Sequence, residues 1–189
     1  DMLGLDHAQC EVDVLEFEDL YRQTTLPFLS VENRPLPEAI FQKMVHADNL
    51  WQAPNFLTGM GQLESEELDE WALLNNRRLK RMRLDLMMRV SQHLINSYEF
   101  ELALQWLNRT IMLDEEYMLP GAVFLKIEVL FRMQRWNESY EYATASIREM
   151  GMDWFAGHSL QLKSMLEQME NIHRRQPEIM AITLPAQTA

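Results

Sequence analysis

Two segments of this chain repeat the same kinds of residue at an interval of 36 positions, and this repeat constrains the fold more than any other feature. The first copy is Phe100, Ala103, Leu107 and Thr110, and the second is Trp136, Ser139, Ala143 and Ser146. In each copy an aromatic residue opens an amphipathic stretch and a small residue follows three positions later. Helix pairs that cannot bury their apolar faces alone repeat their chemistry in this way, so the pattern predicts stacked helical hairpins.

The pattern resembles the tetratricopeptide repeat, a helical hairpin of about 34 residues in which a small residue lets the partner helix approach closely. The first helix lacks the glycine of that repeat, and acidic residues 114–116 stand where a proline would close it. We therefore expect an all-α fold of tetratricopeptide-like hairpins in a short right-handed superhelical array of about seven helices. An irregular helical bundle is the alternative, since amphipathic helices joined by short loops permit both.

Apolar residues recur at helical spacing along most of the chain, with only 6 glycines and 7 prolines to interrupt them. The spacing predicts a long helix over 66–96 that Ser65 would cap. It predicts further helices over 12–24, from Pro37 to near Asn49, and over 100–113, 121–132, 136–150 and 154–175. We interpret 51–63 as a loop, residues 1–176 as one domain and residues 177–189 as a linker or disordered tail.

The composition restricts the classes of partner and compartment. With 29 acidic and 17 basic residues, the chain has a net charge of -12, which disfavours direct binding of nucleic acid. The single cysteine, Cys10, cannot form an intramolecular disulfide, and no secretory signal or long apolar run is present. We therefore expect a cytoplasmic protein that does not engage a membrane.

Basic residues are concentrated in one predicted helix, with six cations in the thirteen residues from Arg77 to Arg89. Most such runs are solvated helix faces. A functional interpretation is that this helix docks on an acidic surface, with Arg77, Arg78 and Arg81 as binding residues. That surface could be the chain's own segment 13–19, a second subunit, or DNA beside a bound winged helix.

A concave groove lined by the first helices of the hairpins is the second candidate for a partner site. Its predicted liners are Met87, Ser91, Phe124 and Glu128. Methionine side chains would provide adaptable contacts there, although most of the 14 methionines fill the core. Four tryptophans are interpreted as core anchors rather than as a ligand cage: Trp71, Trp106, Trp136 and Trp154.

The sequence contains no recognisable catalytic or cofactor motif. The five histidines lack the spacing of a metal site, and no glycine-rich phosphate loop is present. Cys10 stands in no nucleophile signature. We therefore predict that the chain is not an enzyme and has no catalytic residues, no metal and no cofactor.

Several segments, taken in order, resemble the bacterial transcriptional activator domain of antibiotic regulatory proteins and related activators. The resemblance rests on Val14–Leu20, Leu50–Gly59, Trp71 with Arg77–Leu79, Tyr98–Leu104 and Leu113–Glu116. The departures are Ala53 for a glycine, Glu115 for a proline, and Gln134–Trp136 for a glycine-containing turn.

In that family the domain follows a winged-helix DNA-binding domain, so the resemblance implies a regulatory function. It would couple partner binding or oligomerisation, including a homodimer, to an attached DNA-binding domain, and contact DNA only through that domain. Partners would be a neighbouring domain, a second copy or the transcription machinery. The alternative is a free-standing tetratricopeptide-like adaptor that binds a peptide or protein partner.

Overall fold

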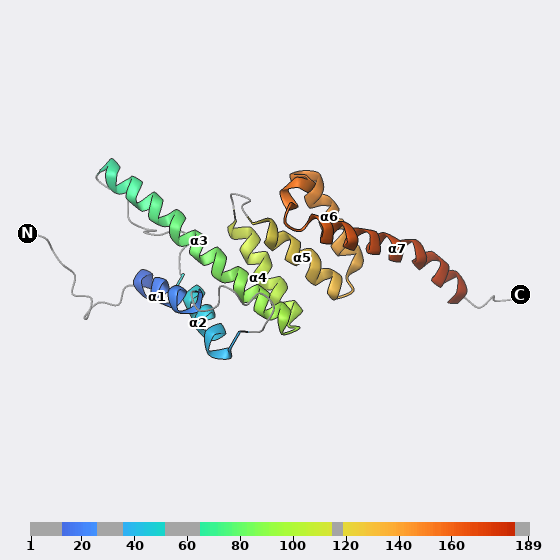
Figure 1. Cartoon of the computed structure of the whole chain (residues 1–189), viewed down its shortest axis with the longest axis horizontal. Helices are drawn as coiled ribbons and strands as arrows, with labels where there is room; N and C mark the ends of the chain where they lie inside the picture. The colour runs from blue at the N-terminus through green and yellow to red at the C-terminus, as the bar shows by residue number, and fades with distance from the viewer. Residues whose placement is uncertain (1–12, 26–35, 52–64, 115–118, 184–189) are drawn as a thin grey trace, which may run out of the picture. The chain divides into compact units, whose positions relative to one another are not determined.

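The computed structural model describes residues 13–25, 36–51, 65–114 and 119–183, with side chains described up to residue 174. Every regular element in these ranges is helical (Figure 1). The helices are α1 (Asp13–Thr25), α2 (Glu38–Asn49), α3 (Glu66–Asn96), α4 (Phe100–Leu113), α5 (Pro120–Arg132), α6 (Trp136–Met150) and α7 (Ser159–Thr183), with a 3₁₀ turn η2 (Met152–Phe155) before the last. The predicted all-α class with about seven helices is confirmed.

The predicted ends of three helices agree with the structure residue for residue. These are α3, α4 and α6, and α1, α2 and α5 differ from their predicted bounds by one residue. Ser65 caps α3 as predicted, because its Oγ accepts a hydrogen bond from the Leu68 amide at 3.2 Å. The loop predicted over 51–63 lies outside the described residues beyond Trp51.

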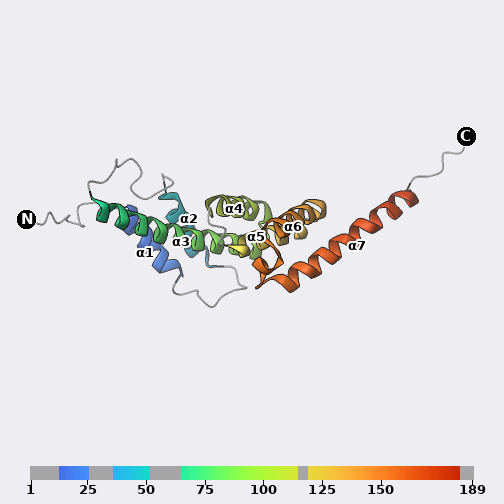
Figure 2. The same cartoon turned by 90° about the horizontal axis from the view of Figure 1, so that it is seen from above.

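The bounds predicted for the last helix, 154–175, are wrong at both ends. Gly151 stops α6 with a φ of 83°, and the 3₁₀ turn η2 delays the start of α7 to Ser159. The helix then passes through Pro177 and ends at Thr183 (Figures 1 and 2). A proline removes one backbone hydrogen bond and strains the helix but leaves the following turns free to form. That residues 177–189 act as a linker stays a prediction.

The chain divides into two compact units, Asp1–Trp106 and Leu107–Ala189. The prediction of one domain over 1–176 is untested by this division, since two compact units can belong to one domain. No helix in the described part of the chain is long and apolar enough to cross a membrane.

The first unit is built around the long helix α3, against which α1 and α2 pack (Figures 1 and 2). Phe17 of α1 meets the edge of the Trp51 ring at 5.5 Å between ring centroids. Met44 and Ala47 of α2 are fully buried, as is Leu86 of α3. These contacts hold α1 and α2 on α3, where the basic run of the sequence lies.

The second unit has a core formed by α5, α6, η2 and α7. Its fully buried residues include Ile127, Ala143, Phe155 and Leu162. Ser139 donates a hydrogen bond from its Oγ to the Ile127 carbonyl at 2.9 Å, so the small side chain joins α6 directly to the backbone of α5.

The turn before α4 and the turn before α6 have the same backbone conformation. In the first, the amides of Tyr98 and Glu99 donate to the carbonyls of Ile95 and Leu94 at 3.1 and 2.9 Å. In the second, the amides of Gln134 and Arg135 donate to the carbonyls of Phe131 and Leu130, both at 3.0 Å. This pair of bonds is the Schellman motif of a helix end, with Tyr98 and Gln134 in the left-handed position.

The repeated positions of the sequence are also buried in both copies. Ala103 and Leu107 of α4 are fully buried, as are their counterparts Ser139 and Ala143 of α6. The interval of 36 residues therefore marks a repeated helix and turn. The tetratricopeptide-like superhelical array itself stays a prediction.

Candidate protein-interaction surface on the third helix

The basic run of α3 separates into cations that hold the unit together and cations that face solvent. Arg83 belongs to the first group: its Nε donates to Oδ1 of Asp48 at 2.8 Å, and its guanidinium lies 4.9 Å from the centre of the Trp51 ring. The Arg83 and Asp48 side chains are only 12% and 1% exposed. This ion pair therefore fixes α2 on α3 and is closed to a partner.

Two more cations of the run bond to carboxylates of the same unit. Arg78 donates to Glu18 of α1, and Arg89 donates to Asp85 at 2.9 Å. Asp85 also accepts the hydroxyl of Tyr21 at 3.0 Å; burial and the negative charge of Asp85 raise the pKa of Tyr21 to about 12. The bond from Arg78 to Glu18 joins the basic helix to the chain's own segment 13–19.

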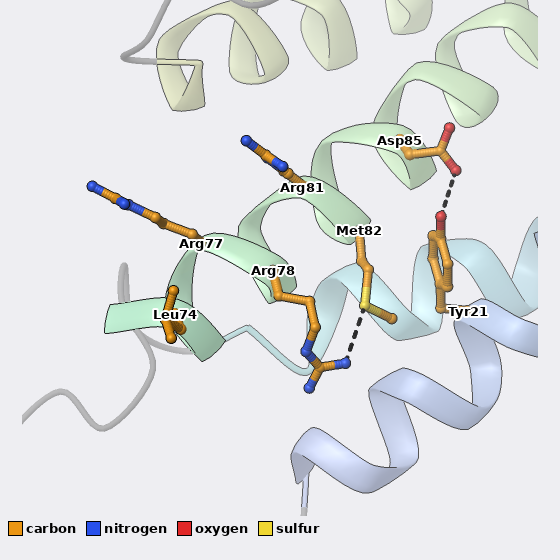
Figure 3. Close-up of a pocket in the computed structure, with 7 residues that line it drawn as sticks. All are labelled: Tyr21, Leu74, Arg77, Arg78, Arg81, Met82 and Asp85. Atoms are coloured by element: carbon orange, nitrogen blue, oxygen red, sulfur yellow. Dashed lines mark hydrogen bonds between the residues drawn. The ribbon is translucent and has the colours of Figure 1, made fainter. Parts of the chain in front are cut away.

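Arg77 and Arg81 remain exposed, and neither side chain forms a hydrogen bond or ion pair with any residue that the structure describes. In Figure 3 both side chains extend from α3 away from α1, whereas Arg78 and Met82 point toward it. An open groove of about 660 Å³ runs beside them. Its lining residues are Tyr21, Leu74, Arg77, Arg78, Arg81, Met82 and Asp85.

The groove combines positive charge with apolar surface. Leu74 is 57% exposed, although it is a large aliphatic side chain at the middle of the exposed part of α3. An exposed leucine is not expected on a helix face that only contacts water. Arginine side chains next to exposed apolar surface are typical of protein-binding sites. The three predicted binding residues Arg77, Arg78 and Arg81 therefore lie together at one groove.

The other predicted liners lie elsewhere. Met87 and Ser91 are buried in α3, and the Ser91 hydroxyl donates to the Met87 carbonyl of its own helix at 2.9 Å. Phe124 is buried in the second unit, where its ring stacks on His158 at 4.3 Å. Glu128 is partly exposed and bonds to Arg132 one turn later. The structure thus assigns Met87, Ser91 and Phe124 to the interior, which corrects their prediction as groove liners.

The sequence interpretation missed the first three turns of α3, residues 66–78, none of which is buried. They carry exposed Leu68, Trp71, Leu73 and Leu74 together with exposed acids that include Glu67 and Glu70. At 100° per residue, Glu67, Glu70 and Trp71 fall within about 60° of Leu74, as do Arg77 and Arg81. Glu67, Leu74 and Arg81 follow one another at intervals of seven residues, or about two helical turns. This spacing places them on one helix face and could have indicated the surface from the sequence.

The remaining ionisable groups do not assemble a site of another kind. Within the described ranges, no three histidine, cysteine or acidic side chains lie close enough to hold a metal ion. His46 bonds to Glu16 at 3.0 Å on the surface of the first unit. In the second unit, Lys126 lies 4.1 Å from the centre of the Tyr142 ring, and burial lowers the pKa of this lysine.

Comparisons with protein-family models, with curated proteins and with solved structures find no match to this chain.

Proposed function

We propose that this chain is a non-catalytic protein-interaction domain and that the exposed face of α3 is its binding surface. The observation that carries the proposal is the separation of the basic run. Arg78, Arg83 and Arg89 bond to carboxylates of the same unit, whereas Arg77 and Arg81 extend into solvent beside the exposed Leu74. Two unpaired arginines on a chain of net charge -12 attract an acidic partner surface.

The finer proposal is that this domain regulates a bacterial transcription activator, in which partner binding or self-association is transmitted to an attached DNA-binding domain. It is supported by the ordered sequence resemblance and by the all-helical fold. Binding would act by favouring one arrangement of the attached domain over another, which requires different contacts in the two arrangements. DNA would be contacted by the attached domain, and the compartment would be the cytoplasm.

A free-standing adaptor is the second candidate function, and the repeated hairpin turns favour it. Two successive turns with the same hydrogen bonds, 36 residues apart, are typical of helical-repeat proteins that bind peptides or proteins. This candidate shares the binding surface on α3 and lacks the link to transcription.

The experiment that separates the two candidates replaces the chromosomal gene by one that encodes Arg77→Glu and Arg81→Glu, followed by transcript profiling. A regulatory domain predicts that a defined group of genes loses or gains expression. The matched control is Arg148→Glu, an exposed arginine of α6, which should leave the profile unchanged. An unchanged profile in the double variant, at an unchanged protein level, would contradict the transcriptional function and favour the adaptor.

A further inference from the structure

The exposed half of α3 has a self-complementary arrangement of charge around Leu74. Glu67 and Arg81 lie seven residues before and after Leu74, and Glu70 and Arg77 lie four residues before and three residues after it. All four are exposed and lie within about 60° of Leu74 around the helix. We infer that two copies of this chain pair antiparallel through this face, with Leu74 on the two-fold axis.

Two-fold symmetry explains the arrangement, because an isologous interface uses the same surface of both copies. A contact between an acid of one copy and an arginine of the other is then repeated with the two copies exchanged. An antiparallel partner helix places its Arg81 opposite Glu67, because both residues lie within about 20° of Leu74 around the helix. It places its Arg77 opposite Glu70, because these two residues lie on the same flank, about 40° to 60° from Leu74. Leu74 of one copy then meets Leu74 of the other.

The charges of this face have few partners within their own helix. Glu67 and Glu70 have no basic residue three or four positions later, where a helix places its ion-pair neighbours. Neither acid, and neither Arg77 nor Arg81, forms an ion pair with another side chain in the described part of the chain. Acidic and basic residues thus occupy separate turns, and a second helix running the opposite way neutralises both.

Nucleic acid fits this face less well than a second copy. Phosphates would be attracted by Arg77 and Arg81 but repelled by Glu67 and Glu70 on the same side of the helix. Binding of an unrelated protein would not require acidic residues on one side of Leu74 and arginines on the other. The two-fold pattern therefore favours self-pairing.

The pairing is expected to be weak and reversible. The segment from Glu67 to Arg81 spans roughly 21 Å at about 1.5 Å per residue. One pair of helix faces of that length buries less than the roughly 1,600 Å² of a standard interface. We expect a dissociation constant in the micromolar range, so that local concentration controls the pairing. This inference rests on the proposed function, because it names the partner of the same surface.

The test is sedimentation equilibrium of the full chain from about 1 to about 500 µM, a range that brackets micromolar dissociation constants. The wild-type chain should pass from monomer to dimer. Glu67→Arg and Arg81→Glu should each raise the dissociation constant of the dimer about tenfold or more. Each substitution is present in both copies, so it places like charges opposite each other at two positions of the interface. The double variant with both changes should regain the wild-type dissociation constant, since the two charges are exchanged.

Asp69→Arg is the matched control for the acidic side. It removes an acidic residue of the same first turn but lies on the opposite side of the helix from Leu74, so it should leave the dimer unchanged. Circular dichroism checks that every variant keeps its helix content.

Three results would overturn the self-pairing. These are a wild-type chain that is monomeric throughout the range, a charge-exchanged double variant as dissociated as the single variants, and a monomeric chain that binds duplex DNA through Arg77 and Arg81. A monomeric chain would leave the proposed function intact if the transcript profile still depended on Arg77 and Arg81.

Discussion

Tyr98 and Gln134 occupy the same place in two successive helical turns, 36 residues apart, with left-handed backbone at φ values of 62° and 61°. Each follows the last turn of its helix and is bonded by the same pair of amide-to-carbonyl hydrogen bonds. The interval found in the sequence is therefore repeated in the backbone. The position normally belongs to glycine, which adopts this conformation without steric cost.

Replacing Gln134 by glycine should stabilise the chain. A side chain in the left-handed region costs about 1 to 2 kcal/mol, and glycine relieves that strain at the cost of more unfolded-state entropy. We expect a net gain of about 0.5 to 1 kcal/mol in the free energy of unfolding, measured by urea denaturation. The exposed Gln134 side chain forms no hydrogen bond with the residues that the structure describes.

Glu141→Gly is the control for the glycine at position 134. Glu141 is exposed and lies inside α6, where glycine is unfavourable by about 1 kcal/mol relative to alanine. Loss of stability in both variants would contradict the assignment of Gln134 to a strained turn.

Breaking the ion pair between Arg83 and Asp48 should destabilise the first unit strongly. Arg83→Ala removes the guanidinium that bonds to the Asp48 carboxylate, which is only 1% exposed, and we expect a loss of about 3 to 5 kcal/mol in the free energy of unfolding. Arg132→Ala is the matched control, because the Arg132 pair with Glu128 is a surface pair within one helix, and its loss should be below about 1 kcal/mol. Equal losses in denaturant unfolding would show that burial of the first pair has no energetic consequence.

Stability should fall as the pH decreases through the unfolded-state pKa of histidine, partly because of His93. Burial lowers the pKa of His93, and its Nδ1 accepts the amide of Leu36 at 2.9 Å, which requires an unprotonated nitrogen. The unfolded chain takes up this proton near pH 6.5 and the folded chain only at lower pH. Between those two pKa values the unfolded state binds more protons, so stability is lost as the pH falls.

His93→Asn removes the titration while keeping a side-chain acceptor. The stability difference between the wild-type chain and this variant should be largest at pH 8 and should narrow at pH 5. Thermal unfolding at the two values of pH measures it. A difference that stays constant between pH 8 and pH 5 would mean that His93 is not the group that titrates.

Most helices could be predicted because their signals are local. Ser65 provides a cap for α3, and the aromatic residues Phe100 and Trp136 mark the starts of α4 and α6. The last helix could not be placed correctly, because Gly151 starts a 3₁₀ turn and Pro177 fails to end α7. Both outcomes depend on packing and backbone strain that residue preferences do not contain.

The candidate site could be predicted only in part, because a basic run does not show which of its members are neutralised. Arg83 lies on the buried side of α3 only because Asp48, 35 residues earlier, is there to receive it. The sequence spacing of Met87 and Ser91 is compatible both with lining a groove and with lying in the core. Both residues are buried in the structure because of how the helices of the unit pack.

Ser139→Leu should disrupt the second unit. Ser139 is fully buried and donates a hydrogen bond to the Ile127 carbonyl. A leucine side chain does not fit between α5 and α6, so we expect the free energy of unfolding to fall by about 1 to 3 kcal/mol. The loss of the hydrogen bond adds to this cost. Ser139→Ala should cost only about 1 kcal/mol, since it removes the bond and keeps the small size. If the melting temperatures of the leucine and alanine variants are the same, close approach at Ser139 is not what the repeated small residue provides.

The exposed face of α3 around Leu74 should bind a second copy of the chain. Cysteine crosslinking measures this pairing, because Cys10 is the chain's single cysteine and can be replaced by serine. In that background we predict that Leu74→Cys forms a disulfide-linked dimer under mild oxidation, since the two thiols meet at the two-fold axis. Leu73→Cys is equally exposed but lies on a different side of the helix, so it should crosslink much more slowly. Equal crosslinking rates at positions 73 and 74 would show that the two copies do not meet at Leu74.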